Sequence, residues 1–276
     1  MKIDFISDIH IDFYVSINSP VDQQAKVIKK FVETLLPPIP AKYIIVAGDI
    51  GHFDKQNLVF MSRLSKIYDK VFYTYGNHDL YLIYETEKEL NNRDSMNRTK
   101  FLSDETKKFG NVFFLDGDVV QVDDKFFGGF PVWYDGTYGK YFHGLMDFVL
   151  DRIWKSCIND HRYIFLNGKN VGLMRIIESL FVEQYKRLLD NVEQCDLIFS
   201  HVPPSWSHIK PPYQDPTSSF FCFDGQKAIE KCSGKSWIFG HTHVELDYVL
   251  GDCHFLCNPL GYPLERKNIK IKSIEI

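Results

Sequence analysis

The chain has 276 residues, with 32 lysines and arginines against 36 aspartates and glutamates, so its formal net charge is −4. Hydrophobic residues make up 45% of the chain and charged residues 25%, which is typical of a soluble globular protein with a sizeable core. The mild acidity argues against a dedicated nucleic-acid-binding protein, because such proteins usually carry a basic excess. The length allows one large domain or two small ones.

Neither a signal peptide nor a membrane span is indicated. Asp4 and Asp8 interrupt the N-terminal segment where a signal peptide needs an apolar core. No run approaches the roughly 18 apolar residues of a membrane-spanning helix. The cysteines form no CxxC pair and no dense framework, so we expect reduced thiols in a cytoplasmic protein, with Cys253 and Cys257 flanking one strand. The six cysteines are Cys157, Cys195, Cys222, Cys232, Cys253 and Cys257.

Short apolar and β-branched runs, each followed by polar or glycine-rich residues, predict strands along the whole chain. They lie, in order, at residues 3–6, 43–47, 71–74, 112–115, 119–122, 126–130, 197–200, 237–239, 244–250 and 269–274. Apolar residues at i, i+3 and i+4 spacing predict amphipathic helices at residues 24–36 and 173–189. The first of these helices ends at Pro37, which cannot continue it.

The alternation of strands and helices predicts an α/β fold. We expect a two-sheet β-sandwich flanked by helices and formed by a single domain over residues 1–276, since no repeat or low-complexity linker divides the chain. Two segments fit this plan poorly. Residues 80–110 are charged and partly helical, and residues 131–170 are aromatic and irregular. We interpret both as insertions that could form a cap.

Five polar motifs follow directly after predicted strands. Because ligand sites in open α/β sheets form at the carboxyl ends of strands, we expect these motifs to converge on one crevice. Each motif alone is a weak signal, since Asp-x-His or Gly-Asp commonly marks an ordinary turn. Together they indicate a metal site with imidazole, carboxylate and amide ligands. The motifs are Asp8-Ile9-His10, Gly48-Asp49, Gly76-Asn77-His78-Asp79, His201 and Gly240-His241-Thr242-His243.

This ordered set resembles the signature of the calcineurin-like metallophosphoesterases, which reads D-x-H, G-D, G-N-H-[DE], H and G-H-x-H. The matching motifs run from residue 8 to residue 243, nearly the whole chain. The resemblance implies the four-layer αββα fold of that family. Residues 130–134 and 257–263 also resemble segments of a poorly characterised bacterial and phage branch, which usually has arginine at the position of Leu260.

The resemblance implies two divalent metal ions, with Asp49 bridging them. The mixture of imidazole, carboxylate and amide donors independently favours Mn²⁺, Fe or Zn²⁺ over Ca²⁺ and Mg²⁺, which prefer more oxygen ligands. Among these we favour Mn²⁺. The remaining implied ligands are Asp8, His10 and His243 for the first ion and Asn77, His201 and His241 for the second.

The same resemblance implies a reaction. Two aspartates, two divalent ions and one bridging hydroxide leave a net charge of about +1, which suits an anionic phosphate. Attack of that hydroxide on phosphorus is the implied chemical step. His78 is expected to be catalytic and to hydrogen-bond the phosphoryl or leaving-group oxygen, and Asp79 is expected to hold its imidazole in orientation.

Other polar and aromatic residues receive simpler interpretations. We interpret His52 as a surface turn residue, although it lies close after Asp49. Four further histidines are interpreted as surface or packing residues: His143, His161, His208 and His254. Four arginines are either solvated charges or contacts for a substrate phosphate: Arg93, Arg98, Arg152 and Arg162. Five aromatic residues either cap the site or pack the second insertion onto the sheet: Trp133, Tyr134, Tyr138, Tyr141 and Phe142.

The leading hypothesis is a dinuclear metal-dependent phosphoesterase that hydrolyses a small phosphomonoester or phosphodiester, with no nucleic-acid or membrane partner. One alternative is a nuclease acting on DNA or RNA, which the net charge disfavours and a steep salt dependence of the rate would support. The other is a metal-binding scaffold that has lost catalysis, against which the retained His78 argues. Mn²⁺-stimulated hydrolysis of p-nitrophenyl esters distinguishes enzyme from scaffold. No motif indicates an oligomeric state.

Overall fold

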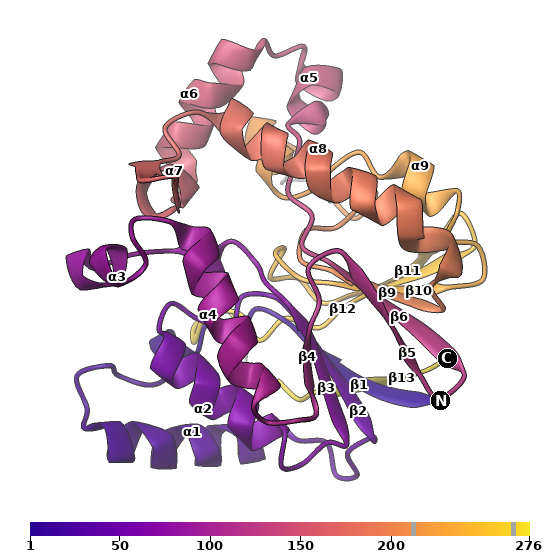
Figure 1. The fold of residues 1–276 in the computed structure, drawn as a ribbon. Helices are drawn as coiled ribbons and strands as arrows, with labels where there is room; N and C mark the ends of the chain where they lie inside the picture. The colour runs from indigo at the N-terminus through magenta and orange to yellow at the C-terminus, as the bar shows by residue number, and fades with distance from the viewer. Residues whose placement is uncertain (211–213, 266–268) are drawn as a thin grey trace.

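Two β-sheets form the centre of the protein in the computed structural model, which describes residues 1–210, 214–265 and 269–276 (Figure 1). The first sheet has five strands in the order β13-β1-β2-β3-β4, and the second has six in the order β11-β12-β10-β9-β6-β5. In the first sheet only the pairing of β13 with β1 is antiparallel. In the second sheet β6, β9, β10 and β12 are parallel, and the edge strands β5 and β11 run antiparallel to them.

The strands have the following bounds: β1 Lys2–Ile6, β2 Tyr43–Ala47, β3 Lys70–Thr74, β4 Val112–Phe114, β5 Asp118–Val122, β6 Lys125–Phe130, β9 Leu197–Ser200, β10 Ser236–Phe239, β11 Leu246–Leu250, β12 Cys253–Cys257 and β13 Lys272–Glu275. A small separate hairpin joins β7, Phe165–Leu166, to β8, Lys169–Asn170.

Helices cover the outer face of each sheet (Figure 1). Helices α1, Val21–Leu35, α2, Asp54–Leu64, and α4, Ser95–Lys107, lie on the first sheet. Helices α8, Met174–Asn191, and α9, Gln226–Ile229, lie on the second. The short α3, Glu85–Leu90, precedes α4, and α5, Thr137–His143, α6, Asp147–Cys157, and α7, Asp160–Tyr163, follow β6. The predicted α/β fold, with two sheets between helical layers, is confirmed.

The core between the sheets explains why the strand sequences are almost continuously apolar. All five residues of β2 are buried, because both faces of this central strand are covered. Across the sandwich, the ring of Phe72 on β3 stacks on Phe127 of β6, with centroids 4.9 Å apart. Separate apolar clusters lie between each sheet and its helices, for example Ile28 and Val32 of α1 with Ile44 of β2.

The strand predictions agree with the structure to within three residues at each end. The expectation of an irregular segment over residues 131–170 is wrong, since α5, α6 and α7 occupy most of it. In α6, Leu150 and Trp154 are four residues apart and both are buried, so one face of this helix packs inward. The run of exposed and aromatic residues around these two positions conceals that helical spacing.

The expectation of six reduced thiols is also wrong, because Cys232 and Cys253 form a disulfide. Cys232 precedes β10 and Cys253 begins β12, and these two strands are neighbours in the second sheet. Cys157, Cys195 and Cys222 have free thiols, and Cys257 ends β12 as expected. Among the described residues, no helix is long and apolar enough to cross a membrane. The cytoplasmic location stays a prediction.

We expect Phe127→Ala to lower the free energy of unfolding by about 3–5 kcal/mol, because the large ring is fully buried between the sheets and its loss leaves a cavity. Urea titration followed by circular dichroism measures the change. Phe148→Ala is the control, since Phe148 is exposed on α6 and its loss should cost less than about 0.5 kcal/mol. Equal unfolding midpoints for Phe127→Ala and the wild type would contradict this account of the core.

Candidate metal centre

The loops after five strands bring all seven predicted ligands into one cluster. The loop after β1 carries Asp8 and His10, the loop after β2 carries Asp49, and the loop after β3 carries Asn77. The loop after β9 carries His201, and the loop after β10 carries His241 and His243. Their ligand atoms form overlapping groups with internal distances below 4.8 Å: Asp8, His10 and His243; His10, Asp49 and His78; and Asp49, His201 and His241. The predicted convergence of the motifs is therefore observed.

Backbone conformation at the cluster is unusual. Five of the seven predicted ligands have φ between 43° and 68°, in the left-handed region that non-glycine residues seldom adopt: Asp8, His10, Asp49, His241 and His243. The motif glycines allow close approach. A Cβ on Gly48 would lie 2.5 Å from His201 Nδ1, and one on Gly76 would collide with Asp49 Oδ1. The tight turns thus direct several polar side chains into a small volume.

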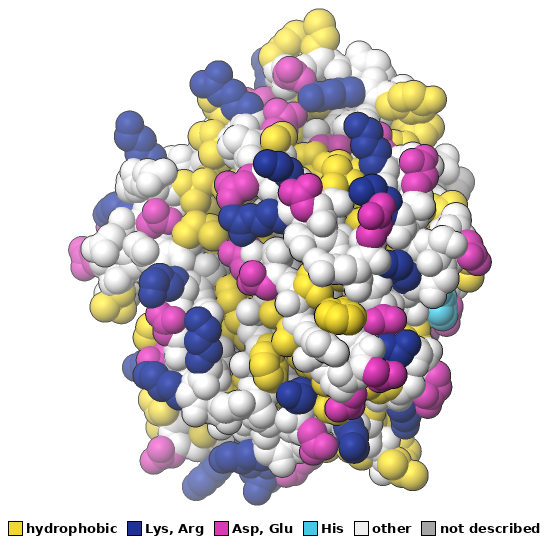
Figure 2. All heavy atoms as spheres, turned by 45° about the vertical axis from the view of Figure 1, so that its right-hand side comes forward, with side chains coloured by type: hydrophobic (Ala, Val, Ile, Leu, Met, Phe, Trp, Pro, Cys, Tyr) yellow, Lys and Arg dark blue, Asp and Glu magenta, His cyan; other side chains and the backbone are white. Residues whose placement is uncertain are grey.

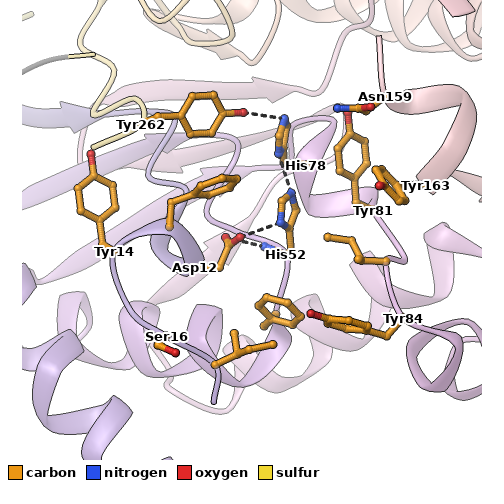
Figure 3. Close-up of a pocket in the computed structure, with 14 residues that line it drawn as sticks. Asp12, Tyr14, Ser16, His52, His78, Tyr81, Tyr84, Asn159, Tyr163 and Tyr262 are labelled. Carbon is orange, nitrogen blue, oxygen red and sulfur yellow. Dashed lines mark hydrogen bonds and ion pairs between the residues drawn. The ribbon is translucent and has the colours of Figure 1, made fainter. Parts of the chain in front are cut away.

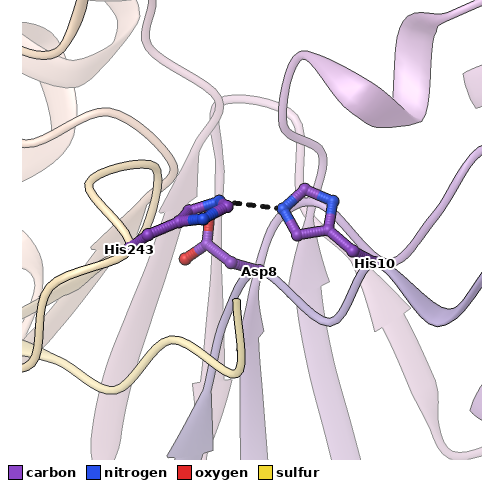
Figure 4. Close-up of side chains that lie close together, drawn as sticks. All are labelled: Asp8, His10 and His243. Carbon is purple, nitrogen blue, oxygen red and sulfur yellow. Dashed lines mark hydrogen bonds and ion pairs between the residues drawn. The ribbon is translucent and has the colours of Figure 1, made fainter. Parts of the chain in front are cut away.

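The first half of the cluster contains Asp8, His10 and His243 (Figure 4). His10 Nε2 lies 2.9 Å from His243 Nε2, and His243 Nε2 lies 3.7 Å from Asp8 Oδ1. The far side of the His243 ring is held in place, since Nδ1 donates a hydrogen bond of 2.7 Å to the Glu265 carboxylate. Nε2 of His243 is therefore left to face the other two side chains.

The second half of the cluster contains Asp49, Asn77, His201 and His241. His201 Nε2 lies 3.3 Å from Asp49 Oδ2 and 3.2 Å from Asn77 Oδ1. Here too, one nitrogen of each imidazole is bound by the protein. His201 Nδ1 donates to the Ala47 carbonyl, and His241 Nε2 donates to the Phe220 carbonyl. Such contacts fix the tautomer and leave the opposite nitrogen available as a ligand.

The charges in the cluster are strongly coupled. Burial would raise the pKa of Asp49, but His201 and His78 hold it well below its usual range, so Asp49 is ionised. Burial would lower the pKa of His201, but Asp49 raises it to about 9. Burial lowers the pKa of His241 to about 4, aided by repulsion from His201, which keeps this imidazole neutral. Among the described residues, no lysine or arginine forms an ion pair with Asp8 or Asp49.

The donor set fits divalent metal ions. Ligand atoms about 2.0–2.2 Å from one ion are roughly 3–4 Å apart, which matches the separations above. Nε2 of His10 and Nε2 of His243 face each other at 2.9 Å, and no lysine or arginine among the described residues pairs with the buried carboxylates of Asp8 and Asp49. A metal cation between these groups would be stabilised by all of them. Asp49 Oδ2 also lies 3.8 Å from His10 Nε2, so one carboxylate reaches both halves of the cluster.

The predicted contact of Asp79 with the His78 ring is wrong. Asp79 Oδ2 accepts hydrogen bonds from the backbone N–H groups of Asp49 and Gly76, and Oδ1 accepts one from that of Ile50. Residues 78 and 79 lie in a 3₁₀ turn, His78–Leu80, where neighbouring side chains point about 120° apart. Asp79 therefore ties the loops after β2 and β3 together while His78 points elsewhere.

His52 takes the position expected for Asp79, and its interpretation as a surface residue is wrong (Figure 3). Its Nε2 lies 2.7 Å from His78 Nδ1, and its Nδ1 lies 2.7 Å from the Asp12 carboxylate. Burial would raise the pKa of Asp12, but the hydrogen bond from His52 lowers it, so Asp12 accepts. With Nδ1 of His52 donating to Asp12, Nε2 of His52 accepts the proton of His78 Nδ1, which leaves His78 Nε2 facing the site. A histidine three residues after a ligand was the available sequence signal.

A buried carboxylate from the second insertion orients Asn77. Asp160, the first residue of α7, accepts hydrogen bonds from Asn77 Nδ2, Tyr81 OH and Tyr134 OH at 3.0, 2.6 and 2.6 Å. Because the amide nitrogen donates to Asp160, the amide oxygen of Asn77 faces His201 and the cluster. Sequence reasoning missed Asp160, since no motif surrounds it.

The remaining candidates lie away from the cluster. Arg98 is buried and binds Asp54 and the carbonyls of Tyr81 and Gly51, so it is a structural residue. The other three arginines, Arg93, Arg152 and Arg162, are exposed. Of the five aromatic residues, Trp133, Tyr134 and Tyr138 are buried in packing positions, whereas Tyr141 and Phe142 are exposed beside Trp206. The histidines interpreted as surface or packing residues, His143, His161, His208 and His254, lie outside the metal-ligand groups.

Residues 257–263 run beside the loop of Asp8. The Leu260 and Gly261 N–H groups donate to the carbonyls of Ser7 and Asp8, and the Leu260 side chain is buried against the first sheet. Tyr262 follows, with its ring centroid 4.7 Å from that of His10 and its hydroxyl 3.5 Å from His78 Nε2. Leu260 thus packs in the core, and Tyr262 forms part of the site.

Comparisons with known proteins agree with this geometry. The family model for calcineurin-like phosphoesterases matches residues 1–245. The uncharacterized protein L509 of Acanthamoeba polyphaga mimivirus is 24% identical over 275 residues, covering 96% of this chain and 92% of that protein. The crystal structure of the phosphopantetheinyl hydrolase PptH from Mycobacterium tuberculosis is similar with a TM-score of 0.71 and 17% identity, covering 98% of this chain and 95% of that one. The family match spans most of the sequence and all the clustered ligands, and the protein therefore belongs to the calcineurin-like phosphoesterases as a metal-dependent hydrolase.

Proposed function

We propose that the protein hydrolyses a small phosphate ester, either a monoester or a diester, with two divalent metal ions, Mn²⁺ being the favoured metal. The observation that carries this proposal is Asp49, whose carboxylate lies within 4 Å of His10 and His201 in the two halves of the cluster. When bound, two ions so close together activate water and neutralise charge on phosphoryl oxygens. We assign Asp8, His10 and His243 to one ion and Asn77, His201 and His241 to the other.

We assign His78 the role of positioning and protonating the leaving-group oxygen. Burial lowers the pKa of its imidazole well below the usual range, so the free ring is neutral, with its lone pair on Nε2. Donation from Nε2 therefore requires the imidazolium form. The negative charge of a bound phosphate ester favours that form, and so does Asp12 at the far end of the hydrogen-bonded chain through His52. Asp12 and His52 are positioning residues in this scheme.

The surroundings favour a small substrate over a nucleic acid. In the part of the chain that the structure describes, no lysine or arginine lines the pocket beside His78, whereas phosphate backbones are usually held by such side chains. On the face drawn in Figure 2, basic and acidic side chains are interspersed and form no basic tract. Because the similar structure PptH is named a phosphopantetheinyl hydrolase, a phosphopantetheine diester belongs in the substrate panel.

The first test is hydrolysis of p-nitrophenyl phosphate and bis(p-nitrophenyl) phosphate by the wild type with Mn²⁺, together with metal analysis. We expect turnover of at least one ester and about two ions per chain. Asp49→Ala should abolish turnover and reduce the metal content, because both ions lose a shared ligand. Two bound ions without any turnover would instead identify a silent scaffold. A preference for DNA or RNA that falls steeply with salt would identify a nuclease.

The second test separates His78 from the metals. His78→Gln should retain the metal content but lower kcat for an alkyl phosphate ester by about 10²–10⁴-fold, the usual range for a general acid. The loss should be much smaller for p-nitrophenyl phosphate, because p-nitrophenolate leaves readily without a proton. His52→Gln should also lower kcat for the alkyl ester and for p-nitrophenyl phosphate, but by a smaller factor than His78→Gln does. Equal losses for the two leaving groups would remove His78 from proton donation.

The third test concerns Asp160. Asp160→Asn should weaken binding of one Mn²⁺ by about 10–100-fold, because a neutral amide has one acceptor oxygen in place of two and cannot accept from Asn77, Tyr81 and Tyr134 as the carboxylate does. Calorimetric titration of the metal-free protein measures the affinity, and circular dichroism verifies folding. Asp147→Ala is the matched control, since this acid is exposed in the same insertion and should leave both affinities unchanged. Wild-type affinity in a folded Asp160→Asn protein would contradict the assigned role.

A further inference from the structure

A pocket of about 700 Å³ opens beside the metal centre (Figure 3). Seven of its 14 described lining residues are phenylalanine or tyrosine, and none of the 14 is lysine or arginine. Its volume is within the range of small-molecule sites in proteins. An aromatic recess without cationic side chains thus adjoins a centre whose chemistry suits phosphate.

The pocket begins at the catalytic residues. His78 lines it and also belongs to the group that contains His10 and Asp49. Tyr262 lines it as well and packs against the rings of His10 and His243 at 4.7 and 4.9 Å. A group that is bonded to phosphorus and directed toward His78 would therefore extend into this recess. That direction is the one assigned above to the leaving group.

Aromatic rings line two sides of the recess. Tyr14 and Tyr262 lie on one side, and Tyr81 and Tyr163 lie on the other (Figure 3). Both predicted insertions contribute to it, since Tyr81 precedes α3 and Tyr163 ends α7. The recess therefore presents aromatic side chains to a ligand from two sides.

Part of this aromatic surface is open. Phe13 lies 4.7 Å from Tyr262, and Phe53 stacks on Tyr84 at 5.8 Å. Phe13 and Tyr84 are each 49% exposed although both line the pocket. Covering such faces with a flat ring removes apolar surface from water, and stacking of a base on an aromatic side chain adds further stabilisation.

The charges around the pocket further restrict the kind of ligand that it can bind. Among the described lining residues, Asp12 is the only acid, and its carboxylate is already bound by the Nδ1 and backbone N–H groups of His52. These described residues offer no lysine or arginine to a second phosphate or a carboxylate on the ligand. Ser16 and Asn159 supply neutral polar groups for hydrogen bonds.

We infer that this pocket binds the leaving group of the substrate and that the leaving group carries a flat, uncharged aromatic ring of the nucleobase kind. The inference rests on the proposed phosphoesterase function and specifies its substrate class. It assigns Tyr84 and Phe13 as residues that determine specificity.

Direct binding tests the inference with adenosine and methyl β-D-ribofuranoside, which share a sugar and differ in the base. In calorimetric titrations of the Mn²⁺-loaded protein, adenosine should bind about tenfold more tightly or better. Tyr84→Ala should weaken adenosine binding by about fivefold or more, and Tyr84→Phe, which keeps the ring, should not. Phe142→Ala is the control, because Phe142 is half exposed but lies outside the pocket. Equal affinities for the two probes, or no effect of Tyr84→Ala, would overturn the inference.

A kinetic experiment distinguishes failure of the pocket assignment from failure of the proposed phosphoesterase function. Adenosine 5′-monophosphate and ribose 5-phosphate release the same primary alcohol group, so their intrinsic reactivities match. They are compared as monoesters, or as methyl diesters if the enzyme accepts only diesters. We expect kcat/KM to be about tenfold higher for the adenosine compound and this ratio to fall toward one in Tyr84→Ala. If the wild type hydrolyses p-nitrophenyl esters but its kcat/KM values for the adenosine and ribose compounds are nearly equal, the assignment of the pocket is overturned and the proposed phosphoesterase function stands. Absence of all ester hydrolysis overturns the proposed function together with the pocket assignment.

Discussion

Two buried carboxylates that pair with no lysine or arginine among the described residues impose the main constraint on this protein. Asp8 and Asp49 lie at the carboxyl ends of β1 and β2 and are removed from solvent, where an unpaired charge is costly. The chain surrounds them with imidazoles, an amide and backbone N–H groups. Asp8 accepts the N–H of His241, and Asp49 accepts the N–H of His78. These contacts reduce the cost but leave the cluster suited to cations, which is the physical basis of the metal-dependent activity.

Three separate parts of the chain position the side chains of the cluster. The two sheets supply the loops that carry the ligands, and Asp79 joins two of these loops through backbone hydrogen bonds. The second insertion supplies Asp160, which orients Asn77. The segment after β12 supplies Glu265, which orients His243. Because these contributions span residues 8 to 265, local changes in the insertion or in the last segment are transmitted to the metal ligands through single hydrogen bonds.

The sequence predicts the fold and the clustering of the proposed ligands because both depend on strong local signals. A buried strand such as β2 is apolar at every position, and each ligand stands in a short motif directly after such a strand. The residues that orient the ligands have no such signal. Asp160 contacts Asn77 across 83 residues, and Glu265 contacts His243 only because the last segment folds back. The contact of His52 with His78 depends on the direction of the His78 side chain in the 3₁₀ turn His78–Leu80, and sequence spacing does not reveal that direction.

Anomalous diffraction from crystals grown with Mn²⁺ tests the central claim most directly. The account predicts two manganese peaks about 3.5–4 Å apart, one beside Asp8, His10 and His243 and one beside Asn77, His201 and His241, with the Asp49 carboxylate between them. A single peak, peaks at another location, or two peaks without Asp49 as a shared ligand would contradict it.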